Sequence, residues 1–135
     1  MIVVVASAIT EFLLQTKLGT RVEQRLYRDG DDLHAPHLLD VEVLSALRRL
    51  VQTHEVSAER AADAVDDLAL LRIVRHGHVD LATRAWELRD NFTAYDAMYL
   101  ALAEALAATV VTCDAPFAAA RGHSARIEVI RAGSP

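Results

Sequence analysis

A carboxylate within an apolar helix is the feature of this sequence that most clearly points to chemistry. Residues 93–108 are predicted to form one helix, which only Asp96 and Glu104 interrupt with charge. Such a helix is buried on most sides, and an ionised carboxylate there is costly unless something compensates it. The helix dipole supplies only about 0.3–1 kcal/mol in the first turn. No cationic side chain lies one turn from Asp96, so we expect a partner from elsewhere, preferably a divalent metal ion.

Two further acids occupy settings that favour a site. Asp114 almost directly follows a predicted strand at 109–112 and so lies at a strand's carboxyl end, although it could instead be the N-cap of a helical turn at 116–120. Glu42 lies within the apolar stripe of a long helix predicted for 36–53. A lone glutamate is normally solvated, but the apolar neighbours of Glu42 argue against that reading, whereas Asp40 points elsewhere and is expected to be exposed.

Short apolar runs alternate with amphipathic segments along the chain. This alternation predicts an α/β fold whose central, mostly parallel sheet is covered on both faces. Ser7, Thr20 and Ser57 are predicted to cap helices, and Pro36 to lie in a first helical turn. Strands are predicted at 2–6, 33–35, 72–75, 109–112 and 127–130, and helices at 8–15, 20–28, 36–53, 57–71, 79–89 and 93–108, with a helical turn at 116–120.

Size and charge narrow the class of protein. The 135 residues fit a single domain spanning 1–135. A formal charge of −5 argues against a general electrostatic grip on nucleic acid, although it leaves room for a local basic patch or a metal ion. The most apolar stretch, 94–111, contains two acids and is a poor membrane span. The start lacks a basic region typical of signal peptides, and one cysteine suits the cytoplasm, so we expect a cytoplasmic protein.

The three acids together predict a metal site. In open parallel sheets, ligands bind outside the carboxyl ends of the strands, where Glu42, Asp96 and Asp114 can converge. Clustered carboxylates repel one another and raise each other's pKa unless a cation holds them. Ligation by oxygen atoms alone suits Mg²⁺ or Mn²⁺, and such a site is suited to hydrolysing phosphodiesters.

Four sequence blocks, in order along the whole chain, resemble the signatures of PIN-domain ribonucleases, most closely the VapC toxins of toxin–antitoxin pairs. The resemblance implies a compact three-layer α/β/α sandwich and endonucleolytic cleavage of RNA with Mg²⁺ or Mn²⁺. It also implies a homodimer, and a small antitoxin whose C-terminal segment covers the acidic groove. The blocks are Met1-Ile-Val-Val-Val-Ala-Ser7, Asp40-Val-Glu-Val-Leu-Ser-Ala-Leu-Arg-Arg49, Tyr95-Asp-Ala-Met-Tyr-Leu-Ala-Leu-Ala103 and Thr112-Cys-Asp114.

Carried over by position, Glu42, Asp96 and Asp114 match the metal-site acids of the family. Thr112 matches a common hydroxyl beside the last of them, so these four residues form the expected catalytic set. Val5 stands where the family has an aspartate at the end of the first strand. Because that acid is commonly a metal ligand, we expect weak activity or none. A naturally degenerate member and an altered residue both remain open.

Several other residues invite functional readings. Arg48, Arg49 and Arg121 are candidates for phosphate contacts with RNA, against the alternative of a solvated basic face. Cys113 adjoins Asp114, but no base is evidently paired with it, and a small buried residue is the favoured reading.

Three functions compete at this point. The first is a metal-dependent endoribonuclease toxin. The second is a catalytically degenerate PIN fold that binds an antitoxin or RNA, which Val5 favours. The third, a receiver-like signalling domain, needs a lysine after a late strand. Lys17 is the only lysine in the chain, so we reject this third reading.

Overall fold

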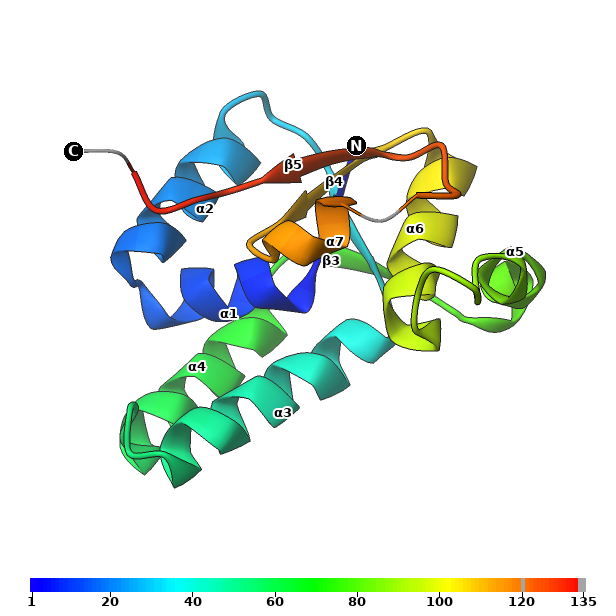
Figure 1. Cartoon of the computed structure of the whole chain (residues 1–135). Helices are drawn as coiled ribbons and strands as arrows, with labels where there is room; N and C mark the ends of the chain where they lie inside the picture. Colours follow the sequence, from blue (N-terminus) through cyan, green and yellow to red (C-terminus); the bar gives the residue numbers. More distant parts are fainter. Residues whose placement is uncertain (120, 134–135) are drawn as a thin grey trace.

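One parallel sheet organises the computed structural model, which describes residues 1–119 and 121–133 (Figure 1). The strands lie in the order β3-β2-β1-β4-β5, and every neighbouring pair is parallel. The predicted α/β class is therefore confirmed, with a sheet that is parallel throughout. The strands are β1 (Ile2–Val4), β2 (Leu33–Pro36), β3 (Ile73–His76), β4 (Thr109–Thr112) and β5 (Arg126–Val129).

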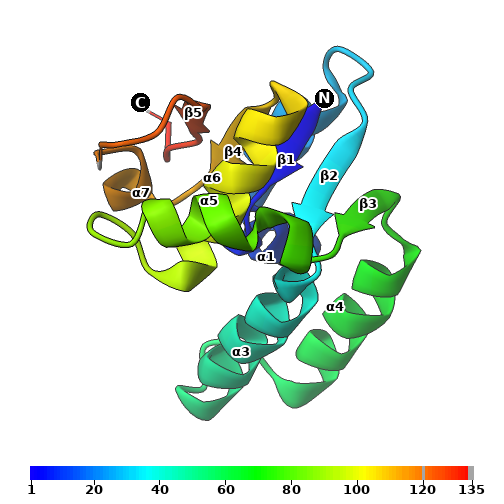
Figure 2. The same ribbon diagram turned by 90° about the vertical axis from the view of Figure 1, so that its right-hand side faces the viewer.

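Helices flank the sheet and complete three layers. Figure 2 shows α5 and α6 in front of the sheet, α1 behind it, and α3 and α4 below the end of β2. No helix in the described ranges has the length and apolar character needed to cross a bilayer. The helices are α1 (Ala6–Leu14), α2 (Lys17–Tyr27), α3 (Leu38–Gln52), α4 (Ala58–Leu70), α5 (Ala82–Glu87), α6 (Ala94–Leu106) and α7 (Ala115–Ala119), with a 3-10 helix at Val79–Leu81.

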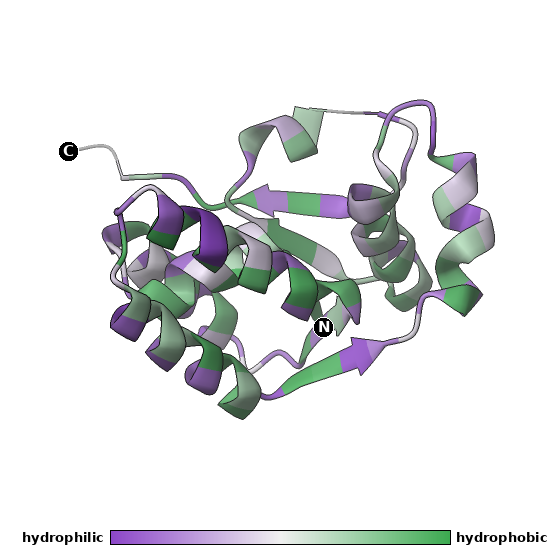
Figure 3. Cartoon of the chain, turned by 90° about the horizontal axis from the view of Figure 1, so that it is seen from below, coloured by the Kyte–Doolittle hydropathy of each residue, from purple (hydrophilic) through white to green (hydrophobic). Residues whose placement is uncertain are grey.

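The central strand β1 is the most deeply buried part of the sheet. Ile2, Val3 and Val4 are each 1% exposed or less. Both edges of β1 pair with neighbours and both faces are covered, a setting that favours an unbroken run of β-branched residues. In Figure 3 the middle of the sheet is mainly hydrophobic (green), whereas the helices around it have both hydrophobic and hydrophilic (purple) residues.

Two helices at the start of the chain begin earlier than predicted. Val5, not Ser7, occupies the N-cap position of α1, and its side chain has no acceptor to offer. The Ser7 hydroxyl instead accepts a hydrogen bond from the Cys113 backbone N–H at 3.0 Å. Thr16, not Thr20, caps α2 by accepting from the Gly19 N–H at 2.9 Å. The predicted Ser57 cap of α4 is confirmed.

The start of α3 also differs from the prediction. Pro36 is the last residue of β2, where it pairs with His76, and not part of a first helical turn. The helix begins at Leu38, whose backbone N–H donates to His78 Nε2 at 3.0 Å. A side chain from beyond β3 thus supplies the acceptor, which local sequence patterns do not reveal.

Glu104, the second acid of α6, has a structural role. It accepts two hydrogen bonds from Arg84, at 2.6 and 3.0 Å, and two more from the backbone and hydroxyl of Ser124. The hydrogen bonds from Arg84 are the main reason that the pKa of Glu104 falls to about 2. This carboxylate therefore ties α5 and the segment before β5 to α6, and it stays ionised.

Candidate functional site

One groove of about 500 Å³ collects the three candidate acids at the carboxyl edge of the sheet. Glu42 comes from α3, Asp96 from the first turn of α6, and Asp114 from the segment directly after β4. Val5 and its neighbours add the end of β1 and the start of α1. The full lining is Val5, Ala6, Ser7, Val41, Glu42, Ser45, Ala46, Arg49, Tyr95, Asp96 and Asp114.

Glu42 is half-buried and held by a neighbour that sequence reasoning missed. The Tyr99 hydroxyl donates a hydrogen bond to Glu42 Oε1 at 2.7 Å. Burial raises the pKa of Glu42, the Tyr99 hydrogen bond opposes that rise, and the charge of Asp96 adds to it. Tyr99 lies one turn beyond Asp96 on an apolar helix. A buried tyrosine hydroxyl needs a partner, and that need was the available signal.

Asp96 and Asp114 have no cationic partner among the residues that the structure describes. Thr93 caps α6 by accepting from the Asp96 backbone N–H, but within the described chain neither aspartate's carboxylate takes part in a hydrogen bond or ion pair. Burial, and next the charge of Asp114, raise the pKa of Asp96. For the pKa of Asp96, burial and the repulsion from Asp114 thus outweigh the helix dipole, which favours the ionised form by about 0.3–1 kcal/mol.

Thr112 lies beneath the groove and does not line it. Thr112 is fully buried, and its hydroxyl accepts a hydrogen bond from the Asp114 backbone N–H at 3.0 Å. Ser7, which does line the groove, has its hydroxyl 3.2 Å from Thr112 Oγ1. Thr112 therefore supports the turn that carries Asp114, and Ser7 joins that turn to the start of α1.

Of the three candidate arginines, the structure brings Arg49 to the acids. Arg49 lines the groove on α3, and within the described residues it forms no ion pair. Arg48 and Arg121 are exposed and lie outside the lining of the groove as described. Arg49 thus has the position from which a guanidinium can meet a phosphate bound beside the acids.

Asp40, two residues before Glu42, has a different setting from the groove acids. Its carboxylate accepts two hydrogen bonds from Arg75, at 2.7 and 2.8 Å. The Asp40 side chain is partly exposed, whereas the sequence predicted an exposed one.

Cys113 is half-buried, and burial, followed by the charge of Glu11, raises the pKa of its thiol to about 11. Its thiol is therefore protonated at neutral pH, in agreement with a packing role.

The acids fit a hydrated divalent cation better than a closed cage. Within residues 1–119 and 121–133, no three histidine, cysteine or acidic side chains are placed to hold one metal ion together. Mg²⁺ is commonly held by one or two carboxylates and several waters, which Asp96, Asp114 and the free oxygen of Glu42 can provide. Val5, 6% exposed at the groove wall, offers no ligand atom.

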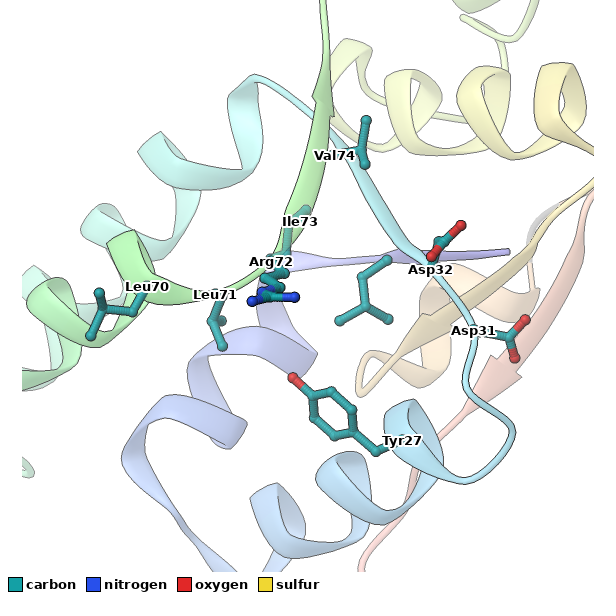
Figure 4. Close-up of a pocket in the computed structure, with 9 residues that line it drawn as sticks. Tyr27, Asp31, Asp32, Leu70, Leu71, Arg72, Ile73 and Val74 are labelled. Atoms are coloured by element: carbon teal, nitrogen blue, oxygen red, sulfur yellow. The ribbon is translucent and has the colours of Figure 1, made fainter.

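A second pocket lies at the amino ends of β2 and β3, on another part of the molecule (Figure 4). Tyr27 reaches across it toward Leu71 and Arg72. One of its acids, Asp31, is already bound to the N-terminal ammonium at 2.8 Å. The other acid of this pocket is Asp32, so the pocket does not bring three acids together as the groove does.

Comparison with known proteins decides the family. Residues 2–122 match the PIN domain, and Ribonuclease VapC12 of Mycobacterium tuberculosis is 38% identical over 130 residues, which cover 96% of this chain and 99% of that protein. The chain belongs to the VapC family of PIN-domain ribonucleases. This assignment confirms the resemblance carried by the four sequence blocks.

Solved structures show the same fold. Mycobacterium tuberculosis VapC20, described as a sarcin-ricin loop cleaving toxin, superposes with a TM-score of 0.69 at 17% identity, covering 88% of this chain and 94% of that one. VapBC2 from Rickettsia felis, bound to a DNA fragment from its promoter, gives a TM-score of 0.66 at 15% identity, covering 96% and 98%. The predicted three-layer α/β/α sandwich is thereby confirmed.

The raised pKa of Asp96 gives a test of the groove without any ligand. A carboxyl whose pKa is higher in the folded state contributes stability that is complete below its unfolded pKa, about 3.9 for aspartate, and that is lost as pH rises through the folded value. Ionised Asp96 therefore lowers the free energy of unfolding at neutral pH. We expect Asp96→Asn to raise the Tm at pH 7 by a few degrees, and the gain to vanish near pH 3.

Asp40→Asn is the matched control for this measurement. It removes one charge from an acid that is paired with Arg75, so we expect it to lower the Tm at pH 7. Thermal unfolding followed by circular dichroism across pH 3–8 compares the two variants. A lower Tm for Asp96→Asn at pH 7 would mean that a favourable contact compensates the Asp96 charge.

Proposed function

We propose that this chain is an Mg²⁺- or Mn²⁺-dependent endoribonuclease, the toxin of a toxin–antitoxin pair. The observation that carries the proposal is the convergence of Glu42, Asp96 and Asp114 in one groove, where the two aspartates have no cationic partner in the described part of the chain. The ribonuclease names of its relatives support the choice of RNA as substrate. Phosphodiester hydrolysis is the reaction class that such an acidic, metal-attracting groove suits.

Asp96 and Asp114 are the residues that would hold the ion, with Glu42 beside them. When bound, Mg²⁺ or Mn²⁺ lowers the pKa of a coordinated water and offsets negative charge on the scissile phosphate. The metal requirement also follows from the groove's own electrostatics. The acids would otherwise repel an approaching phosphate, and the raised pKa values of Glu42 and Asp96 show that their charges are not compensated.

The other groove residues act on the substrate and on protons. Arg49 is placed to contact and orient a phosphate of the RNA backbone. Glu42, whose pKa is raised by burial, is suited to accept a proton from the attacking water, because a base works best when its pKa approaches the ambient pH. Thr112 acts indirectly, by holding the turn that carries Asp114.

A second candidate function follows from Val5. An isopropyl group at the groove wall leaves the site one carboxylate short of the family pattern, which favours a degenerate PIN fold that binds an antitoxin or RNA without efficient cleavage. The two candidates differ in turnover and not in fold. Introducing an acid at position 5 therefore separates them.

The proposed partners are a small antitoxin and a second copy of this chain. The fold shared with VapBC2 supports pairing with an antitoxin. Because uncompensated acids attract a guanidinium whose fork matches a carboxylate, we propose that an arginine of the antitoxin enters the groove and excludes both metal and RNA. Homodimerisation remains a prediction from the family resemblance.

Val5→Asp is the principal test of the function. It adds one oxygen ligand and one negative charge at the groove wall, so we expect Mn²⁺ affinity to rise by about tenfold or more, since even indirect changes around a metal site commonly alter affinity by about 10–100-fold. RNA cleavage should rise with it. Isothermal titration with Mn²⁺ and a gel assay on one RNA measure both quantities.

The controls for this test use the neighbouring acids. Asp96→Ala and Asp114→Ala should abolish the gain in the Val5→Asp background, whereas Asp40→Ala, on the same helix as Glu42 but outside the groove, should preserve it. Equal metal affinity and equal turnover with Val or Asp at position 5 would overturn this account of the site.

Arg49 and Arg48 form a matched pair for testing RNA contact. They are consecutive on α3, but only Arg49 lines the groove. We expect Arg49→Ala to weaken binding of a short single-stranded RNA, and to reduce the slope of log affinity against log salt by about one, because one phosphate contact is lost. Arg48→Ala should change neither. Fluorescence anisotropy at several salt concentrations makes the comparison, and equal effects would remove Arg49 from the RNA-binding surface.

The antitoxin proposal predicts a charge dependence. The product of the neighbouring small gene should form a stable complex with this chain on co-expression. Replacing Asp96 and Asp114 by lysine should weaken that complex at least tenfold, because the groove would then repel a guanidinium. An unchanged Kd would place the docking surface elsewhere, with the apolar faces near 8–28 and 36–53 as the next candidates.

A further inference from the structure

Tyr99 links two elements of the groove through its hydroxyl group. The residue lies on α6 and is completely buried. Its hydroxyl donates a hydrogen bond to Glu42 Oε1 on α3 at 2.7 Å. The buried hydroxyl is therefore satisfied by a carboxylate that lies in the groove.

The Glu42 side chain depends on this contact for its place. Glutamate has three rotatable side-chain bonds, and its carboxylate makes no other hydrogen bond or ion pair within the described residues. The charge of Asp96, which lies in the same groove, repels it. Without the Tyr99 hydroxyl, rotation of Glu42 toward solvent would relieve both repulsion and burial. The hydrogen bond is therefore what keeps one carboxylate oxygen in the groove wall and leaves the other free.

The position of Tyr99 along α6 gives this contact a wider consequence. Asp96 and Tyr99 are three residues apart, so they lie on the same side of the helix. The middle of α6 is buried from Tyr99 to Ala103 and packs on β1, β2 and β4. A single well-anchored helix thus places Asp96 directly and Glu42 through a hydrogen bond.

We propose that Tyr99 is a positioning residue of the site, which fixes the Glu42 carboxylate relative to Asp96. The inference rests on the proposed function in one respect, namely that Glu42 serves a metal ion and its water. The competing reading is that Tyr99 is a core residue whose hydroxyl finds a convenient acceptor. The two readings differ in whether Glu42 moves when the hydroxyl alone is removed.

Tyr99→Phe makes that distinction because it keeps the ring and its packing. The first measurement uses metal-free protein and NMR three-bond couplings of the Glu42 side chain. We expect one dominant rotamer in the parent chain and averaged couplings in Tyr99→Phe. Tyr27→Phe, which alters an exposed tyrosine outside the groove, is the control and should leave the couplings unchanged. Identical Glu42 couplings in the parent and Tyr99→Phe would overturn the proposal.

A second measurement asks whether the effect reaches the metal. Mn²⁺ affinity is compared in the parent, Tyr99→Phe, Glu42→Ala and the double variant, with thermal unfolding as a check on folding. We expect Tyr99→Phe to lose about tenfold in affinity when Glu42 is present, in the range typical of groups that orient a ligand, and to lose nothing when Glu42 is absent.

The outcomes separate this inference from the proposed function. An equal loss in both backgrounds would mean that Tyr99 does not act through Glu42, and the proposal would fail. If the parent chain and Val5→Asp both bind no Mn²⁺, the proposed metal-dependent function fails, while the Glu42 couplings still decide whether Tyr99 positions that side chain.

Discussion

Parallel pairing of β1 between β2 and β4 is the constraint on which the rest of the structure depends. It aligns the carboxyl ends of three strands at one edge, so that Val5, α3 and Asp114 all emerge on the same side. The strands have only three or four residues each, and hydrogen bonds such as Val5 N–H to Val111 O at 3.1 Å set their register. A shift of one residue would turn each side chain to the opposite face. The buried β-branched residues of β1 therefore position the groove as well as the core.

The fold divides its carboxylates into two kinds. Glu104, Asp40 and Glu128 each accept two hydrogen bonds from an arginine, a geometry in which charge supports structure. Within residues 1–119 and 121–133, Asp96 and Asp114 receive no such partner, although they lie close enough for the charge of Asp114 to raise the pKa of Asp96. Arg49 lines the groove but forms no ion pair with the acids among the described residues, so the uncompensated charge is a local property of the groove. Uncompensated charge of this kind lowers stability, and clusters of this kind are typical of functional sites.

Much of this architecture could be predicted from the sequence, because the spacing of apolar residues within a short segment indicates whether that segment forms a helix or a strand. The five strands and the Asp96 helix are present near their predicted positions, and Asp96 and Glu42 stood out as acids among apolar neighbours. The starts of α1, α2 and α3 could not be predicted as well. The acceptor for α3 is His78, which lies 40 residues away in sequence, and Ser7 is engaged by Cys113 across 106 residues. Tyr99 was missed for the same reason, since its partner Glu42 is 57 residues distant.

Val5 shows how one position can serve both folding and chemistry. It lies at the N-cap of α1 in an extended conformation, with a φ of −98° and a ψ of 153°, and at the same time in the groove wall. An aspartate there, as in the related family pattern, could accept from the first turn of α1, a contact worth about 0.5–2 kcal/mol at an N-cap. It would also add a negative charge to a groove that already holds Glu42, Asp96 and Asp114, which opposes that gain. These opposed effects make stability a poor reporter of what Val5 does. Metal affinity is the better measurement, because the added ligand atom and the added negative charge of an aspartate at position 5 would both strengthen the binding of a cation.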